Sequence, residues 1–176
     1  MLNNLNLFYK KKILIYGLGK SGLSVLKFLK KNNKITTHDD KIKVDNKKII
    51  KMKFDYIIIS PGIDINRCNL SKFLKNNSKK IYTDLDIFYS HHKLNNKITI
   101  TGTNGKSTTA KILYDVLRDQ KVDVRLVGNI GNPILLEKKV TTRTVFVIEA
   151  SSYQLEYSKL FKSNISLILN ISPDHL

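Results

Sequence analysis

Apolar residues along this chain occur as short runs rich in isoleucine, leucine and valine, separated by stretches whose apolar positions repeat at helical spacing. The runs lack the strict polar alternation of half-exposed strands, so they predict an α/β fold with parallel strands covered on both faces. The expected strands lie at residues 12–16, 34–38, 56–60, 80–83, 122–127, 144–148 and 165–171, and one more runs through Ile98 and Ile100. The expected helices run through Leu23, Leu26, Phe28 and Leu29, over residues 71–76 and 86–90, and from Thr108 through Ala110, Leu113 and Leu117. The last two strands have no following partners, so we expect them to leave their sheet incomplete.

A polar segment without periodicity, residues 91–96, separates two rounds of this alternation. We interpret it as a linker between a Rossmann-like parallel-sheet domain over residues 1–92 and a P-loop ATPase-type domain over residues 97–176. The segment begins with His91 and His92. Neighbouring side chains diverge in direction and no cysteine or acidic residue lies near, so a solvated connection is favoured over a metal site.

A glycine loop between a strand and a helix carries the strongest chemical signal, in the sequence KITITGTNGKSTT at residues 97–109. Glycines let backbone N–H groups close on phosphate oxygens, and the helix amino terminus adds positive potential. Lys106 supplies a mobile cation, and Ser107 can place its hydroxyl on a magnesium ion. The first glycine lies only three residues before Gly105, which departs from the usual spacing. We predict a phosphate site; a turn with a solvated lysine is the alternative, but it leaves the Lys106-Ser107 pair unexplained.

A second glycine motif, GLGKSG at residues 17–22, follows the first expected strand and opens the first expected helix. Asp39 lies twenty residues past Gly19, at the end of the next strand. This pattern provides a tight turn, close approach of the backbone to a pyrophosphate, and an acid near the ribose. NAD and a UDP-sugar fit it equally well, and close helix–strand packing without any ligand remains an alternative.

Polar residues at the ends of later strands extend both candidate sites. Residues 60–62 (Ser-Pro-Gly) close the third strand at the edge where α/β proteins bind ligands, although a purely structural turn explains them equally well. Glu149 and the pair Asp174-His175 each follow a strongly apolar strand. In a parallel sheet they emerge at the same edge as the glycine loop, where oxygen ligands can hold Mg²⁺. Each of them taken alone is more typical of a helix cap.

The net charge of +17 comes almost entirely from lysine, which is abundant together with asparagine and isoleucine throughout the chain. Arginine, which dominates specific base recognition, occurs only four times. A compositional bias therefore explains the charge better than a nucleic-acid surface, while the positive field still favours phosphorylated ligands. The single cysteine, Cys68, excludes a disulfide framework and a cysteine metal site. The apolar run at residues 13–16 is too short for a signal peptide, and no window approaches the ~20 apolar residues of a membrane span, so we expect a cytoplasmic protein.

Six segments together resemble the Mur ligase family of peptidoglycan synthesis. They are GLGKSG at Gly17, SPGI at Ser60, TGTNGKST at Thr101, GNIGNP at Gly128, EASSYQLE at Glu149 and NISPDHL at Asn170. Their order and spacing match over nearly the whole chain. The first two segments and the GTNGKST variant are most similar to members that add D-glutamate to UDP-N-acetylmuramoyl-L-alanine. The phosphate loop alone would fit a superfamily that also includes folylpolyglutamate synthases.

This resemblance implies an ATP-dependent amide ligase, in which ATP phosphorylates the substrate carboxylate and the amine of D-glutamate attacks the acyl phosphate. The implied ATP-binding residues are Gly102, Thr103, Asn104, Gly105, Lys106, Ser107 and Thr108. The implied residues for the UDP-substrate are Lys20, Ser21, Asp39, Asp40, Lys41, Gly62 and Asn129. Lys106 and His175 are the implied catalytic residues, and the implied Mg²⁺ ligands are Ser107, Glu149 and His175.

The resemblance has departures and limits. Asp40-Lys41 stands where relatives often carry Thr-Arg, and Val127-Gly128 replaces a more usual Gly-Gly. Relatives continue past this point through Asp-Arg-His, a modified lysine and a C-terminal domain, so we expect an N-terminal fragment that binds the UDP-substrate but does not ligate by itself. We expect a monomer without a nucleic-acid partner. The alternatives are another Mur-type ligase, a non-catalytic UDP-sugar-binding module and, more remotely, an NAD-dependent enzyme.

Overall fold

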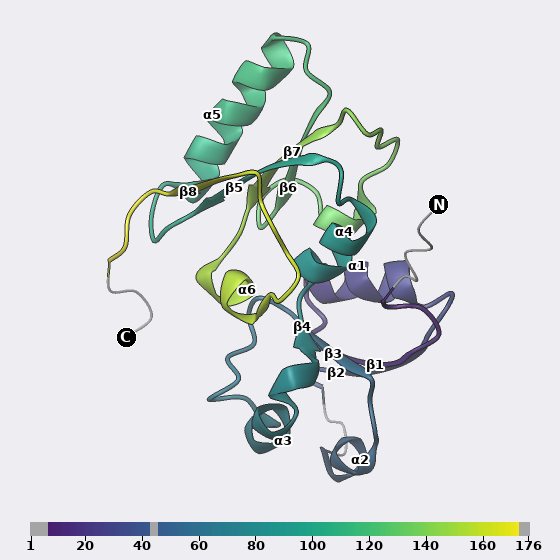
Figure 1. The fold of residues 1–176 in the computed structure, drawn as a ribbon. Coiled ribbons are helices and arrows are strands. Elements are labelled where there is room, and N and C mark those ends of the chain that lie inside the picture. Colours follow the sequence, from purple (N-terminus) through teal and green to yellow (C-terminus); the bar gives the residue numbers. More distant parts are fainter. Residues whose placement is uncertain (1–6, 43–45, 173–176) are drawn as a thin grey trace.

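The computed structural model describes residues 7–42 and 46–172, which form two parallel four-stranded sheets (Figure 1). The first sheet has the strand order β2-β1-β3-β4. Its members are β1 (Lys12–Tyr16), β2 (Lys34–His38), β3 (Tyr56–Ile59) and β4 (Ile81–Tyr82). The two central strands, β1 and β3, are almost entirely buried, as expected for apolar runs without alternation.

Helices cover this first sheet and follow most of its strands. They are α1 (Lys20–Leu29), α2 (Asn46–Lys51), α3 (Ser71–Asn76) and α4 (Asp84–His91), with a short 3₁₀ turn at Ser78–Lys80. On α1 the buried apolar side chains are Val25 and Leu29. Leu23 is 53% exposed and Phe28 is 36% exposed, so the expected apolar face of this helix is only partly correct.

The second sheet has the order β6-β7-β5-β8. Its strands are β5 (Asn96–Thr101), β6 (Val124–Gly128), β7 (Val145–Glu149) and β8 (Ile165–Ile168). Helix α5 (Lys106–Asp119) packs on one face, and α6 (Ser152–Tyr157) and a 3₁₀ turn at Ile134–Leu136 complete this half. We expected the last two strands to leave the sheet incomplete because no later strand follows them. This is wrong for β7, which lies between β6 and β5 and pairs with both, whereas β8 forms the edge of the sheet and pairs with β5.

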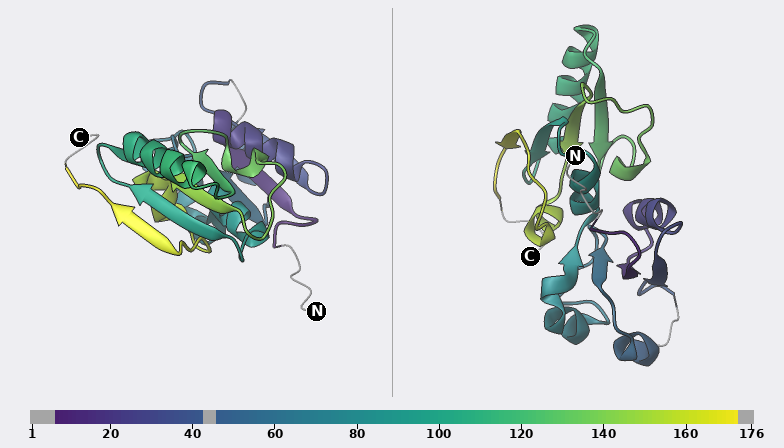
Figure 2. Two further views of the ribbon diagram at one scale, coloured as in Figure 1. Left: turned by 90° about the horizontal axis from the view of Figure 1, so that it is seen from above. Right: turned by 45° about the vertical axis from the view of Figure 1, so that its right-hand side comes forward.

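One apolar cluster joins the two sheets. It contains Ile13 of β1, Phe88 of α4 and Phe146 of β7, and the rings of Phe88 and Phe146 lie edge to face at 4.8 Å. The right-hand view of Figure 2 shows the second sheet above the first, with α4 in the region between them. Because the core is continuous, the division into domains at residues 92 and 97 stays a prediction.

The boundaries of several elements differ from those expected, for local reasons. Helix α5 begins at Lys106 and not at Thr108, directly after Gly105, which has a left-handed φ of +83°. Strand β8 ends at Ile168 and not at residue 171, because its partner β5 ends at Thr101, opposite Ile168. His91 closes α4, so the linker between the sheets is shorter than expected. Helices α2 and α6 have no counterpart among the expected elements.

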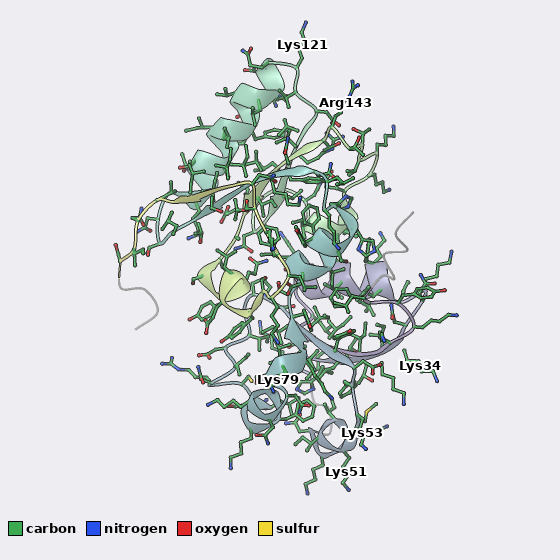
Figure 3. The ribbon with its side chains drawn as sticks, in the orientation of Figure 1. Lys34, Lys51, Lys53, Lys79, Lys121 and Arg143 are labelled. Atoms are coloured by element: carbon green, nitrogen blue, oxygen red, sulfur yellow. The ribbon has the colours of Figure 1, made fainter. Side chains whose placement is uncertain are left out.

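Basic side chains are spread over the molecule. Figure 3 shows Lys121 and Arg143 at one end of the molecule, while Lys51 and Lys53 lie at the opposite end and Lys34 lies at one side. This distribution agrees with a compositional origin of the charge. In the part of the chain that the structure describes, none of the helices combines the length and the apolar character needed to cross a membrane.

Candidate functional site

A cavity of about 460 Å³ opens where the carboxyl ends of the first sheet's strands meet the second sheet. It brings together all seven residues expected at the UDP-substrate, six from the first half of the chain and Asn129 from the loop after β6. The lining residues are Gly17, Gly19, Lys20, Ser21, Asp39, Asp40, Lys41, Ser60, Pro61, Gly62, Ile63, Gly128, Asn129, Gly131 and Pro133. Two lysines and the amino end of α1 make this a site suited to an anion.

Ser60 has a defined role that the turn sequence alone did not reveal. Its hydroxyl donates a 2.7 Å hydrogen bond to the carbonyl of Gly17, which has a φ of +90°. This bond fastens the end of β3 to the glycine turn after β1. Ser60-Pro61-Gly62 is therefore part of the cavity wall, and a serine directly after an apolar strand was the available signal.

The two neighbouring acids in the cavity are held differently. Asp39 accepts hydrogen bonds from the backbone N–H groups of Leu18 at 2.6 Å and Lys41 at 2.9 Å. These bonds to the charged form lower the pKa of the Asp39 carboxyl below its ordinary 3.8. Asp40 accepts a 2.6 Å bond from the hydroxyl of Tyr16, and the buried His38 lies 3.3 Å from the same oxygen. Asp39 therefore fixes the positions of the turn after β1 and the loop after β2. This role does not depend on which ligand group Asp39 also contacts.

We expect the stability that Asp39 provides to depend on pH. Its pKa is lowered in the folded chain, so its contribution is present above the ordinary value of 3.8 and is lost as pH falls through the lowered pKa. In Asp39→Asn that contribution is missing at every pH. Urea unfolding of both proteins should therefore show a difference in midpoint that is constant near neutral pH and shrinks below about pH 4. A difference that stays the same down to about pH 2 would contradict this role.

The predicted phosphate loop lies between β5 and α5. The ammonium group of Lys106 donates to the carbonyls of Gly102 at 2.6 Å and Thr103 at 2.7 Å. Asn170 braces the loop from β8's side, because its side chain accepts from the N–H of Asn104 at 2.9 Å and donates to that residue's carbonyl at 3.0 Å. The sequence pattern placed Asn170 inside the expected strand at residues 165–171, so this role was not predicted; in the structure β8 ends at Ile168 and leaves Asn170 beside the loop.

Glu149 reaches the phosphate loop, as expected for the end of a neighbouring parallel strand. The hydroxyl of Ser107 donates a 2.8 Å hydrogen bond to Glu149 Oε2. A hydroxyl and a carboxylate are hard oxygen ligands, so this pair fits Mg²⁺, which takes few protein ligands and otherwise keeps water or phosphate oxygens. Within residues 7–42 and 46–172 there is no cluster of three or more His, Cys, Asp or Glu side chains suited to a metal. His175 and Asp174 lie outside the described residues.

Comparison with known proteins agrees with this arrangement. A family model described as the Mur ligase middle domain matches residues 100–176. UDP-N-acetylmuramoylalanine–D-glutamate ligase of Rickettsia bellii is 35% identical over 182 residues, which cover 95% of this chain and 40% of that protein. The protein of the same name from Clostridioides difficile is 36% identical over 190 residues, covering 94% and 41%. The chain therefore spans about two fifths of the length of these curated relatives.

A solved structure supports the fold. The ligase from Neisseria meningitides described as UDP-N-acetylmuramate:L-alanyl-gamma-D-glutamyl-meso-diaminopimelate ligase aligns with a TM-score of 0.52 at 14% identity, covering 94% of this chain and 62% of that one. At this identity the likeness concerns the fold only. The family model over residues 100–176 and the sequence relatives, which match nearly the whole chain, agree with the glycine loop and its acidic partner and lead to one conclusion: the chain belongs to the Mur ligase family.

Proposed function

We propose that this chain carries the substrate and nucleotide sites of an ATP-dependent ligase that joins D-glutamate to UDP-N-acetylmuramoyl-L-alanine. The observation that carries the proposal is the pairing of Gly128 with Glu149 on neighbouring strands β6 and β7. Gly128 lines the cavity, and Glu149 holds Ser107 at the start of α5. A substrate in the cavity and a nucleotide on the loop would thus lie at the same edge of one sheet. The relatives named for this reaction support the choice of substrates.

In this proposal the cavity binds the UDP end of the substrate. Lys20 and Lys41 neutralise the pyrophosphate, and the hydroxyl of Ser21 and the backbone N–H groups at the start of α1 donate to its oxygens. Asp39 and Asp40 supply acceptors for ribose or uracil donors. Asn129, which comes from the second sheet, contacts the muramoyl part and directs the carboxylate toward the phosphate loop.

The glycine loop binds ATP. Its backbone N–H groups surround the phosphates, and Lys106 leaves the carbonyls of Gly102 and Thr103 to stabilise charge on the transferred phosphoryl group. Ser107 and Glu149, together with His175, are the proposed ligands of Mg²⁺, which when bound neutralises the phosphate oxygens. An oxygen of the substrate carboxylate attacks the γ-phosphorus of ATP, ADP leaves, and an acyl phosphate forms. The amine of D-glutamate then attacks the acyl carbon, and phosphate and a proton leave as the amide forms. For this function we also propose a cytoplasmic location, which is general for Mur ligases.

The first test is a calorimetric titration of this chain with UDP and, separately, with NAD. Binding of UDP without binding of NAD supports the assignment of the cavity, and binding of NAD alone would overturn it. The second test measures ADP release by a protein of the relatives' full length, given UDP-N-acetylmuramoyl-L-alanine and single amino acids. Release that depends on D-glutamate supports this ligase, whereas dependence on another amino acid identifies a different Mur-type ligase. UDP binding without any ADP release would instead indicate a non-catalytic UDP-sugar-binding module.

A further inference from the structure

The loop that brings Asn129 to the cavity is held by backbone contacts along its length. It follows β6, and its residues in the cavity wall are Gly128, Asn129, Gly131 and Pro133. The N–H group of Asn129 donates to the carbonyl of Glu149 at 3.0 Å. A Cβ atom at Gly131 would lie 2.2 Å from the carbonyl oxygen of Leu126, so this part of the loop lies tightly against β6. The loop therefore has little room to change its path.

One carboxylate holds the far end of this loop through side-chain contacts. Glu137 comes directly after the 3₁₀ turn that follows the loop, and its side chain is only 9% exposed. Its Oε1 accepts a 2.7 Å hydrogen bond from Asn132 Nδ2, and its Oε2 lies 3.4 Å from Arg125 Nε. Arg125 is itself held on β6, because its Nη1 donates to the Asp123 carboxylate at 2.5 Å. The two oxygens of Glu137 thus join the loop to the strand that precedes it.

Glu137 is the fixed end of this contact and Asn132 is the end that can move. The 3₁₀ turn before Glu137 buries Ile134 and Leu135 in the apolar cluster that joins the two sheets. The Arg125 side chain is 27% exposed, so the ion pair is better shielded from solvent than a pair of fully exposed side chains. Asn132 is exposed and belongs to the loop. Loss of the carboxylate would therefore release the loop and not the turn.

We propose that Glu137 is a positioning residue for the substrate, which acts through Asn132 on the loop that presents Asn129. The inference rests on the proposed function, in which Asn129 contacts the muramoyl part and residues of the first sheet bind UDP. Release of the loop leaves the residues of the first sheet in place. The affinity for the sugar part of the substrate should then fall while the affinity for UDP is kept. A general loss of packing would not separate the two ligands in this way.

The experiment measures the affinities for UDP and for UDP-N-acetylmuramoyl-L-alanine by calorimetry. In Glu137→Ala the affinity for UDP-N-acetylmuramoyl-L-alanine should fall at least about fivefold, because a hydrogen bond to a charged group is lost. The affinity for UDP should stay within about twofold of the wild-type value. Asn132→Ala should have the same two effects. The double variant should lose no more than either single one, because both substitutions remove the same contact.

Exchanging the donor and the acceptor tests the contact itself. Asn132→Asp alone places two carboxylates against each other, so the affinity for UDP-N-acetylmuramoyl-L-alanine should fall as it does in Glu137→Ala. Adding Glu137→Gln supplies an amide donor to the new carboxylate and restores the net charge of the wild-type chain. In this double variant the affinity should return to within about threefold of the wild-type value.

Asn164→Ala is the matched control for a loss of stability. Asn164 Oδ1 accepts a 2.9 Å hydrogen bond from the N–H group of Lys97, at the edge of the second sheet where β5 and β8 begin. The loop that carries Asn129 lies at the opposite edge, where β6 ends. Asn164→Ala should lower the melting temperature and leave the ratio of the two affinities unchanged.

Four results would overturn the inference while leaving the binding of UDP intact. They are equal affinities of the wild-type chain for the two ligands, an unchanged affinity for UDP-N-acetylmuramoyl-L-alanine in Glu137→Ala, an equal loss for both ligands in that variant, and no recovery in the exchanged pair. Failure of the wild-type chain to bind UDP at all would instead remove the proposed function, and the inference with it. If Asn132→Asp does not fold, the comparison of Glu137→Ala with Asn164→Ala decides the question.

Discussion

Replacing Lys106 with alanine is expected to abolish productive nucleotide binding while leaving the cavity intact. The Lys106 ammonium group is the cation at the start of α5, and it contacts loop carbonyls that surround the proposed phosphate position. Removing one group aimed at developing charge typically costs on the order of 10²–10³-fold in rate. Calorimetry on this chain should show a strongly reduced affinity for the ATP analogue and an unchanged affinity for UDP. A protein of the relatives' full length should lose ADP release to the same order.

Lys111→Ala is the matched control for this variant. Lys111 lies on the same helix but is exposed, and its ammonium group pairs with Asp115 at 2.6 Å. Surface pairs of this kind contribute little, so nucleotide affinity and stability should stay near those of the wild type. Undiminished turnover in Lys106→Ala would remove the phosphate-loop assignment. An equal loss in both lysine variants would point to a general charge effect on anion attraction and not to a defined site.

The strands were predictable because their signal is local. The central strands of a parallel sheet are buried on both faces, so β1 and β3 appear as unbroken apolar runs that end at glycine or proline turns. The glycine loop and the cavity followed from the same rule, since parallel strands place their carboxyl ends at one edge. This rule alone predicted that Glu149 would lie at the same edge as the glycine loop, and in the structure Glu149 accepts a hydrogen bond from Ser107.

The starts of two helices that we did not predict correctly also have a local signal in the sequence. Thr83 and Asp86 form a capping box that starts α4 at Asp84, earlier than expected, and Ser151 and Gln154 form a second one that starts α6. Both follow the pattern of a hydroxyl residue with an acid or amide three residues later, which marks a helix start. We predicted α4 too short and did not predict α6, because apolar periodicity over so few residues is a weak signal.

Long-range partners could not be predicted from the sequence. Gln154, whose side chain donates to Asp84, and Lys159, whose N–H group donates to Asp86, lie 70 and 73 residues away in the chain, and no local pattern predicts these two bonds. The same holds for Asn170, whose contact with Asn104 depends on β8 pairing with β5. The position of β7 between β6 and β5 likewise follows from pairing across the sheet, which sequence order does not specify.

Gly22→Ala is expected to destabilise the first sheet and the cavity together. A Cβ atom at Gly22 would lie 1.8 Å from the carbonyl oxygen of Gly17 and 2.8 Å from the hydroxyl of Ser60. The first contact is with backbone, so α1 must move away from the turn after β1. Overpacking costs about 1–3 kcal/mol and occasionally more, and a clash with backbone belongs at the upper end. For a chain of this size the melting temperature should fall by roughly 6–12 °C.

The same displacement moves Lys20 and Ser21 relative to the glycine turn, so the affinity for UDP should fall together with the stability. Gly62→Ala is the control for stability alone, because a Cβ there meets no atom within 4 Å and its φ does not lie in the left-handed region, while Gly62 itself lines the cavity. Calorimetric melting of both variants and UDP titration of Gly22→Ala decide the matter. If Gly22→Ala melts and binds UDP as the wild type does, then the close approach of α1 to the turn after β1 is not what forms the cavity. A loss of stability without a loss of UDP affinity would separate the packing role of Gly22 from the binding role proposed for its neighbours.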